Sequence, residues 1–358
     1  MARKRLMIFG EDWGRHPSSS QHLAMALRQR YDIVWINSIG LRQPGWRDLP
    51  RLWHKLWAPK VAADAAPSGI QIRNVRVWPL AQSKWLRRLN RWLFRRQMAD
   101  QPLPDRIMVS LASAEAYLSL YPQVPAAYYC GDDFSALAGV DHAKVARAEQ
   151  RLLDKVAWIF TASEILTQSF RGAIHLPHGV DTAWFAKHFE RPADLPEGKI
   201  IGFYGSFANW LDDALLVQIA TRFPQHSLVM IGQGSGLSSR LWRLPNVINL
   251  GVKPHKALAA YANHFDVALL PFRDDPQIQA CDPLKLREYL AAGCSVVSTD
   301  FPAAHNWLPH VRIGRESNEL LAAIEQSLEQ PACRQAQRAA VSECGWSARA
   351  EQLACYLQ

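Results

Sequence analysis

The sequence predicts an α/β protein with two domains, each built around a parallel β-sheet. The 358 residues are too many for one small core and about right for two α/β domains. Short apolar runs alternate with amphipathic helical patterns through both halves, which is the order of β-α-β units. A segment with Pro192, Pro196 and Gly198 interrupts this alternation near the middle, as a linker does.

The first half opens with a β-α-β unit. Leu6–Gly10 is a short apolar strand, Gln21–Arg30 has a helical pattern, and Asp32–Ser38 is the next strand. Strands joined through a helix pair in parallel, because a parallel pair needs a crossover connection. Ile70–Leu80 is expected to form a strand or a hairpin. Further strands are expected at Arg106–Leu111, Ala126–Cys130 and Trp158–Thr161, and helices at Lys84–Arg96 and Ala143–Val156.

The second half repeats the alternation. Its expected strands are Lys199–Phe207, Ser227–Ile231, Asn246–Gly251, Phe265–Pro271, Ser295–Thr299 and Val311–Gly314, and its expected helices are Asp212–Arg222, His255–Asn263, Asp282–Gly293 and Ser317–Gln330. We therefore expect domains over residues 1–181 and 199–340, joined by a linker over 182–198. The helix in the terminal segment 341–358 has no strand to follow, so it must pack on structure already built.

Composition excludes several classes of protein. Hydrophobic content of 49% and charged content of 20% are typical of a soluble globular chain. No apolar run approaches the roughly 18 residues that a membrane span needs, and Leu6–Phe9 is too short for a signal peptide. The six cysteines form no CxxC pair, which favours reduced thiols in the cytoplasm and argues against a structural zinc site.

The helix Asp282–Gly293 has its boundaries marked in the sequence. Asp282 can cap its first turn, Pro283 suits the first helical position, and Gly293 supplies a left-handed residue at the end. Lys285 and Glu288 lie on one face near the positive N-terminal end. This pair could hold a phosphate and a sugar hydroxyl; the alternative is an ordinary surface ion pair.

Two loops at the carboxyl ends of expected strands carry polar side chains, where ligands bind in open α/β sheets. After the first strand, Arg15, His16, Ser18 and Ser19 could contact an acceptor or a phosphate, or be solvated loop residues. That loop lacks the GxGxxG fingerprint of dinucleotide binding. After the strand Ala126–Cys130, the adjacent Asp132 and Asp133 stand where a catalytic base would be useful; the alternative is a helix cap or a turn.

Positive charge is concentrated in one segment. Residues 42–96 hold 13 basic and 2 acidic residues, a net charge of +11, whereas the whole chain carries +9. Two helical patterns in this segment combine Trp and Leu on one side with Lys and Arg on the other, which is typical of a helix at a membrane interface. The alternative is that these tryptophans pack inward; no nucleic-acid-binding signature accompanies the charge. The residues expected to face the membrane are Trp53, Trp57, Trp85, Arg88, Trp92 and Arg95.

Several stretches resemble the GT-B superfamily of nucleotide-sugar glycosyltransferases. Tyr204–Phe207 is similar to the first strand and glycine loop of its donor domain, and Asn246–Lys253 to the strand and turn whose backbone receives the nucleotide base. The most specific match joins Phe265–Phe272 to Asp282–Gly293, which is similar to the donor-binding strand and helix of family-4-like and exopolysaccharide glycosyltransferases. Tyr129–Ser135 is similar to a motif of xanthan-type glucuronosyltransferases.

The resemblance implies a role for each matching position. Glu288 would bind the ribose, Lys285 the diphosphate, and Asp132 would be the general base of an inverting enzyme. Two positions depart from the family pattern: Ala280 stands where many retaining relatives carry a second Glu, and Asn209-Trp210 where Arg and Lys usually neutralise the diphosphate. The donor-binding residues expected on this basis are Gly205, Ser206, Val252, Lys253, Asp282, Leu284, Lys285 and Glu288.

The sequence therefore predicts a GT-B glycosyltransferase whose C-terminal helix packs back on the first domain. We expect it to move a sugar from a nucleotide-diphosphate donor to a lipid-linked or other saccharide acceptor, in the cytoplasm at an anionic membrane surface. No cofactor and no metal are expected, because Lys285 and its helix end could stabilise the leaving diphosphate. Two alternatives remain: an epimerase of the same fold, which would change the sugar of the donor alone, and a non-catalytic partner subunit, which would bind no nucleotide.

Overall fold

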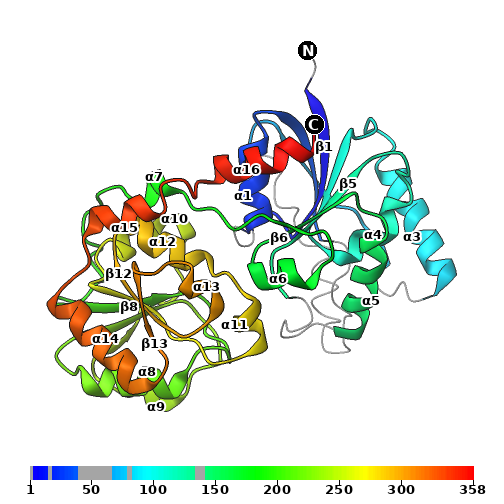
Figure 1. The fold of residues 1–358 in the computed structure, drawn as a ribbon. Coiled ribbons are helices and arrows are strands. Elements are labelled where there is room, and N and C mark those ends of the chain that lie inside the picture. Colours follow the sequence, from blue (N-terminus) through cyan, green and yellow to red (C-terminus); the bar gives the residue numbers. More distant parts are fainter. Residues whose placement is uncertain (1–2, 15–17, 39–66, 79–82, 134–141) are drawn as a thin grey trace. The chain divides into compact units, whose positions relative to one another are not determined.

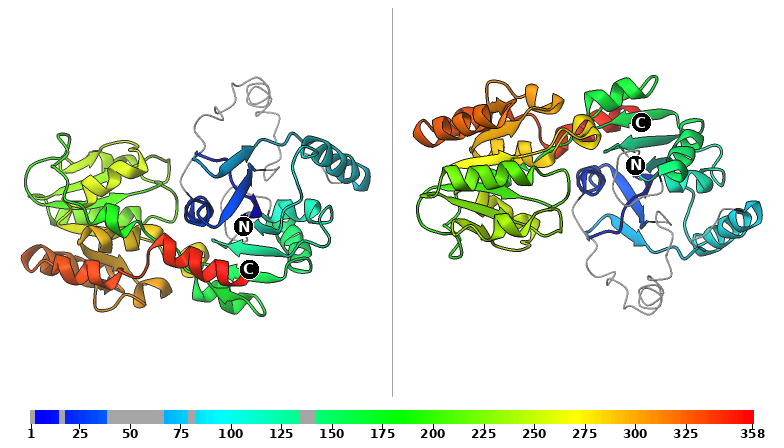
Figure 2. Two further views of the ribbon diagram at one scale, coloured as in Figure 1. Left: turned by 90° about the horizontal axis from the view of Figure 1, so that it is seen from above. Right: turned by 90° about the horizontal axis from the view of Figure 1, so that it is seen from below.

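The computed structural model describes residues 3–14, 18–38, 67–78, 83–133 and 142–358. The chain divides into two compact units (Figure 1). The first unit consists of Met1–Ala162, Leu166–Leu176 and Arg349–Gln358, and the second of Ser163–Ile165 and Pro177–Ala348. Each is a parallel sheet with helices on its faces, which confirms the predicted fold class (Figures 1 and 2).

The first unit holds a seven-stranded sheet in the order β3-β2-β1-β4-β5-β6-β7, with every neighbouring pair parallel. Its strands are β1 (Lys4–Phe9), β2 (Tyr31–Ile36), β3 (Ile70–Arg73), β4 (Arg106–Val109), β5 (Ala126–Cys130), β6 (Trp158–Thr161) and β7 (Ile174–His175). Its helices are α1 (Ser19–Leu27), α3 (Lys84–Gln97), α4 (Glu115–Leu118), α5 (His142–Leu153) and α6 (Glu164–Ser169), of which α6 begins inside the 163–165 segment of the second unit.

The second unit holds a six-stranded parallel sheet in the order β10-β9-β8-β11-β12-β13. Its strands are β8 (Ile200–Tyr204), β9 (Ser227–Ile231), β10 (Val247–Asn249), β11 (Val267–Leu270), β12 (Ser295–Thr299) and β13 (Val311–Gly314). Its helices are α7 (Thr182–Phe185), α8 (Asp213–Arg222), α9 (Ser239–Trp242), α10 (His255–Ala262), α11 (Pro276–Ala280), α12 (Leu284–Ala292), α13 (Pro302–His305), α14 (Ser317–Glu329) and α15 (Arg334–Ala340).

Both sheets follow the doubly wound strand order 3-2-1-4-5-6, counted within each unit, and the first sheet adds a seventh strand beside the sixth. In such sheets the order reverses between the first and fourth strands, and ligands bind outside the carboxyl ends of the strands at that point. The reversal lies between β1 and β4 in the first unit and between β8 and β11 in the second. These two places are therefore where the topology itself predicts binding sites.

Burial on both faces explains why the strands are continuous apolar runs. All five residues of β5 and of β8 are buried, as are all four of β11, because helices cover both sides of each sheet. The core of the second unit includes Phe203, Phe265 and Tyr289, each at most 1% exposed. Apolar burial of this kind is the main stabilising term of such a sheet.

The segment 182–198, which the sequence suggests is a linker, packs as part of the second unit. It contains α7, and Phe185 and Leu195 are buried in the core of that unit. Asn263 Nδ2 donates a hydrogen bond to the carbonyl oxygen of Phe185 at 2.9 Å. The chain therefore enters the second unit at Pro177, before the expected boundary.

The C-terminal helix α16 (Trp346–Tyr356) joins the first unit from Arg349 onward. The hydroxyl of Tyr31 donates to the carbonyl oxygen of Leu357 at 3.1 Å, and Gln352 Nε2 donates to that of His175 at 3.1 Å. The rings of Phe160 and Tyr356 meet edge to face at 5.4 Å. Within the described ranges, no helix has the length and apolar character to cross a bilayer.

Candidate active site

Loops of the second unit meet backbone to backbone at the carboxyl edge of its sheet. Gly205 follows β8 and Gly232 follows β9, and the Gly205 amide donates to the Ile231 carbonyl oxygen at 2.9 Å. Gly232 has a φ of 151°, and a Cβ on it would lie 1.9 Å from the carbonyl oxygen of Gly205. Only glycine fits there, because a side chain would push the two loops apart. The exposed Ser206 lies in the same loop.

Lys285, in the first turn of α12, reaches this glycine loop. A Cβ on Gly205 would lie 2.8 Å from the Lys285 Nζ, which is also 5.0 Å from the ring centre of Phe203 and 5.5 Å from that of Phe272. Among the residues that the structure describes, this ammonium has no hydrogen bond and no ion pair. Loss of hydration lowers its pKa, and the charges of Cys281 and Glu288 only partly oppose that effect. A half-buried cation of this kind at the β8/β11 reversal is suited to an anionic ligand.

Glu288, one turn further along α12, is only 6% exposed and is held from two sides. The Tyr204 hydroxyl donates to its Oε2 at 2.7 Å, and His255 Nε2 lies 2.6 Å from its Oε1. Burial alone would lower the pKa of His255, but the hydrogen bond and charge of Glu288, with the charge of Asp181, raise it above its ordinary value. Tyr204 and His255 are site residues that the sequence analysis did not identify.

The start of α12 differs from the sequence prediction. The helix begins at Leu284, Pro283 occupies the N-cap position, and no side chain caps the helix, so the predicted cap by Asp282 is wrong. Both Asp282 oxygens instead accept from Arg287, each at 2.7 Å, in a pair whose side chains are 5% exposed. Gly293 does adopt the predicted left-handed conformation, with a φ of 86°.

The turn after β10 was predicted to receive the nucleotide base through its backbone. Val252 is 58% exposed in this turn, and the contact with a base stays a prediction. The Lys253 ammonium is already paired, at 2.6 Å from Asp194 Oδ2, and this hydrogen bond lowers the pKa of Asp194. Any role of Lys253 in donor binding therefore falls to its main chain.

Carboxylates gather at the carboxyl edge of the first unit. Asp132 and Asp133 follow β5, and Glu11 follows β1. Asp132 keeps an exposed surface, yet loss of hydration in this crowded loop, together with the charges of Glu11 and Asp133, raises its pKa to about 6. Burial also raises the pKa of Glu11, whose Oε2 is enclosed and has no hydrogen-bond partner among the described residues. The sequence analysis did not select Glu11.

The other residues predicted for acceptor binding have structural tasks or lie outside the description. Ser18 is the N-cap of α1, where its Oγ accepts from the Gln21 amide at 3.3 Å, and Ser19 is buried. Arg15 and His16 fall outside the described residues. Two of the residues predicted to face a membrane, Trp53 and Trp57, also fall outside the described residues.

Helix α3 exposes a face that mixes aromatic and cationic side chains. Trp85 is 64% and Trp92 53% exposed, and the exposed Arg88 and Arg95 share their face at helical spacing. The buried face carries Asn90, Phe94 and Met98 instead. The prediction that the tryptophans and arginines lie on opposite faces is therefore wrong for α3, and so is the alternative that Trp85 and Trp92 pack inward.

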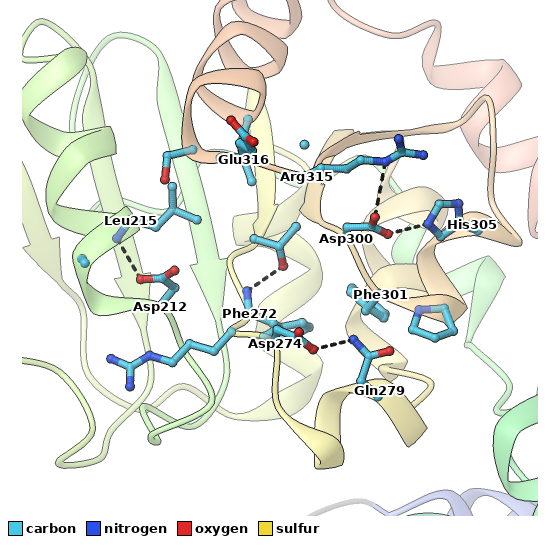
Figure 3. Close-up of a pocket in the computed structure, with 17 residues that line it drawn as sticks. Asp212, Leu215, Phe272, Asp274, Gln279, Asp300, Phe301, His305, Arg315 and Glu316 are labelled. Carbon is cyan, nitrogen blue, oxygen red and sulfur yellow. Dashed lines mark hydrogen bonds and ion pairs between the residues drawn. The ribbon is translucent and has the colours of Figure 1, made fainter.

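A pocket of about 810 Å³ lies at the carboxyl ends of β11, β12 and β13 (Figure 3). Its wall includes an ion pair between Asp300 Oδ1 and His305 Nε2 at 2.5 Å, and the Gln279 amide donates to Asp274 Oδ1 at 2.8 Å. The donor residues predicted from the sequence are not part of its lining within the described chain. The described residues also contain no group of three or more potential metal-binding side chains.

Sequence comparisons locate a known domain in the second unit. Residues 198–330 match the family of glycosyl transferases group 1. The chain is also similar to TuaH of Bacillus subtilis (strain 168), a protein named as a glycosyltransferase of teichuronic acid biosynthesis, with 28% identity over 209 residues. That match covers 52% of this chain and 53% of TuaH, so the chain spans about half the length of the relative.

Structural comparisons cover nearly the whole chain. Sucrose-phosphate synthase from Thermosynechococcus elongatus superposes with a TM-score of 0.73 at 16% identity, covering 99% of this chain and 98% of that one. Anabaena HepE, solved with UDP and glucose, superposes with a TM-score of 0.71 at 13% identity, covering 99% of both chains. The fold is thus the GT-B fold. This confirms the predicted fold, and the domain match places a glycosyl transferases group 1 domain at residues 198–330, in agreement with the predicted class.

Proposed function

We propose that this protein transfers a sugar from a nucleotide-diphosphate sugar to an acceptor hydroxyl. The single observation that best supports the proposal is Lys285, a half-buried ammonium that makes no ion pair within the described residues and lies at the β8/β11 reversal of a group 1 domain. Burying an unpaired cation is costly, so such a group is retained where a ligand brings the missing negative charge. A diphosphate also suits the positive N-terminal end of α12, from which Lys285 projects.

The proposed chemistry divides between the two units. Asp132 of the first unit takes the proton from the acceptor hydroxyl as that oxygen bonds to the anomeric carbon of the donor sugar. The bond from the anomeric carbon to the diphosphate oxygen breaks, and the nucleoside diphosphate leaves with its electron pair. Lys285 and the first turn of α12 stabilise the charge that develops on the leaving group. Attack opposite to the leaving group inverts the configuration, and the step needs no metal in this proposal.

The first experiment compares the contribution of Lys285 to nucleotide binding with that of a second lysine of the same unit, Lys253. Isothermal titration with UDP, the nucleotide present in the HepE structure, would measure the affinity of the wild type and of Lys285→Ala. A lost charge-assisted contact is worth about 1.5–3 kcal/mol, so affinity should fall roughly 10- to 100-fold. The matched control is Lys253→Ala, because Asp194 already neutralises the Lys253 ammonium. Equal effects of the two substitutions would contradict the proposed site.

Acceptor dependence distinguishes transfer from the two alternative functions. A transferase should release nucleotide from its donor in proportion to the acceptor supplied, and a chelator should leave that rate unchanged if no metal takes part. An epimerase would convert the sugar of the donor with no acceptor present. A non-catalytic partner subunit would bind none of the nucleotide diphosphates tested, which a thermal-shift screen would show.

We further propose that the acceptor is lipid-linked and that α3 holds the protein at an anionic membrane surface. The support is the exposed face with Trp85, Arg88, Trp92 and Arg95. Arg87 anchors this helix through an ion pair with the buried Glu115 at 2.6 Å, so the face is presented on a fixed element. Tryptophan suits the headgroup region, and each basic residue near anionic lipid adds about 1 kcal/mol.

Sedimentation with vesicles of phosphatidylcholine and phosphatidylglycerol would test this surface. Replacing Trp85 and Trp92 together by Ala should lower the bound fraction at least roughly tenfold, since two interfacial rings are lost. Leu103→Ala, which removes an apolar side chain 74% exposed elsewhere in the same unit, is the control and should bind like the wild type. Binding that is independent of the anionic lipid would contradict the proposal.

A further inference from the structure

Glu288 is fixed by two groups from different elements of the second unit. Tyr204 ends β8, and its hydroxyl donates a hydrogen bond to Oε2 at 2.7 Å; His255 opens α10, and its Nε2 lies 2.6 Å from Oε1. The two partners lie 84 and 33 residues away from Glu288 in the chain. The direction of the carboxylate is therefore set by the fold of the unit and not by α12 alone.

Each partner is itself held in place. The Tyr289 hydroxyl accepts from the Tyr204 amide at 3.0 Å, and the two tyrosine rings meet at 4.7 Å. The His255 ring lies 6.0 Å from the ring of Phe185, a core residue in the segment 182–198 that the sequence suggested is a linker. Tyr204 is buried, and Asp181 adds negative charge on the side of α7. Side chains fixed in this way lose little entropy when they orient a third group.

A carboxylate has about four acceptor positions, and these two partners occupy one on each oxygen. The remaining positions suit a pair of adjacent hydroxyl donors, which is what the 2′ and 3′ hydroxyls of a ribose offer. Glu288 stands one turn after Lys285 on the same helix, so a phosphate at Lys285 and a ribose at Glu288 belong to one nucleotide.

We propose that His255 is a positioning residue which, with Tyr204, fixes the Glu288 carboxylate as the acceptor for the ribose hydroxyls of the donor nucleotide. This inference rests on the proposed function, because it assumes that a nucleotide binds at Lys285. A purely structural role is the competing explanation, since a buried carboxylate needs hydrogen bonds whatever it does. The two explanations differ in what they predict for recognition of the ribose.

The test compares UDP with 2′-deoxy-UDP by isothermal titration, using the intact chain. The wild type should prefer UDP roughly tenfold, the value of one hydrogen bond to a charged group. His255→Phe should reduce this preference to about twofold or less, and His255→Gln, which keeps an N–H donor, should recover most of it. His264→Gln is the matched control, because that ring, just beyond the end of α10, bonds only the Ala260 carbonyl oxygen in the contacts described, and it should keep the full preference.

The outcomes separate the inference from the proposed function. If the wild type binds UDP and His255→Phe keeps the full preference while its melting temperature falls, His255 is structural and the inference is overturned. If the wild type binds none of UDP, GDP and ADP, the proposed function fails and the inference fails with it. Should His255→Phe not fold, Tyr204→Phe removes only one hydroxyl, and an unchanged preference in that variant also overturns the inference.

Discussion

In both units the first strand is followed by a glycine, and the backbone N–H of this glycine donates a hydrogen bond to the last carbonyl oxygen of the second strand. The Gly10 amide donates to the carbonyl oxygen of Ile36 at 3.1 Å, and that of Gly205 to the carbonyl oxygen of Ile231 at 2.9 Å. What packs against these glycines is different. A Cβ on Gly10 would meet the Trp35 ring at 2.2 Å, whereas a Cβ on Gly205 would meet the Lys285 ammonium at 2.8 Å.

The two edges also differ in charge. The first unit places Glu11, Asp132 and Asp133 at the ends of β1 and β5, and the pKa of Asp132 is raised to about 6. The second unit places Lys285, which makes no ion pair among the described residues, beside glycine backbone, and burial lowers its pKa. The same topology thus carries carboxylates at one sheet edge and an ammonium at the other, so the first suits a proton acceptor and the second an anion.

Asp132→Asn tests the carboxylates at the sheet edge of the first unit, and its effect on turnover is the largest that we expect. The amide cannot accept a proton, so turnover should fall about 10³-fold, within the range typical of a general base. The affinity for UDP should stay within about twofold, because the donor binds to the other unit. Steady-state turnover and isothermal titration measure the two quantities.

Asp133→Asn is the control for that substitution, since it removes a neighbouring carboxylate without removing the proposed base. It should cost turnover less than about tenfold. An Asp132→Asn variant with more than a tenth of the wild-type turnover would show that the proton leaves by another route. In that case the carboxylates of the first unit would not supply the base of the reaction.

Alanine substitutions at Gly232 in the second unit and at Gly10 in the first test whether nucleotide binding beside Lys285 depends on the close backbone contact there. Gly232→Ala places a Cβ 1.9 Å from the Gly205 carbonyl oxygen at a φ of 151°, and strain of this kind costs about 1–3 kcal/mol. We expect a lower melting temperature and weaker UDP binding. Gly10→Ala should lower the melting temperature through the Trp35 clash but leave UDP affinity unchanged. Thermal unfolding and isothermal titration with UDP would measure both quantities. Equal UDP affinities of the two variants would show that the backbone contact at Gly232 does not matter for nucleotide binding.

The smallest expected effect is a shift in the pH profile. Asp132 accepts a proton only when ionised, so turnover should rise with pH through about 6 and level off above it. Glu11→Gln removes one of the negative charges that raise this pKa, so the acid limb should move to lower pH by about half a unit. A limb that stays in place would show that Glu11 does not act on Asp132.

Much of the sheet could be predicted because burial on both faces leaves a simple pattern. The runs predicted as Ala126–Cys130, Ser227–Ile231 and Ser295–Thr299 are β5, β9 and β12 without a shift at either end. The left-handed Gly293 could be predicted for a similar reason, since few other residues tolerate that conformation. Such signals are local, so they are visible in the sequence.

The contacts that define the candidate site are not local, and the sequence analysis missed them for that reason. Nothing in the spacing of His255 and Glu288 indicates that they touch. The pairing of Asp282 with Arg287 is local, but it was missed because it depends on where α12 begins. On α3, Leu and Trp repeat at the same helical spacing, so the pattern could not separate the exposed Trp85 and Trp92 from the inner face. The loops at Gly205 and Gly232 meet only after β8 and β9 have paired.

The order in which the two units are completed follows from the path of the chain. In this division of the chain the second unit extends no further than Ala348. The first unit begins with β1 but also includes Arg349–Gln358, where the carbonyl oxygen of Leu357 accepts a hydrogen bond from the Tyr31 hydroxyl. In chain order, therefore, the unit that begins first is completed last, because the second unit is inserted between its sheet and its final helix.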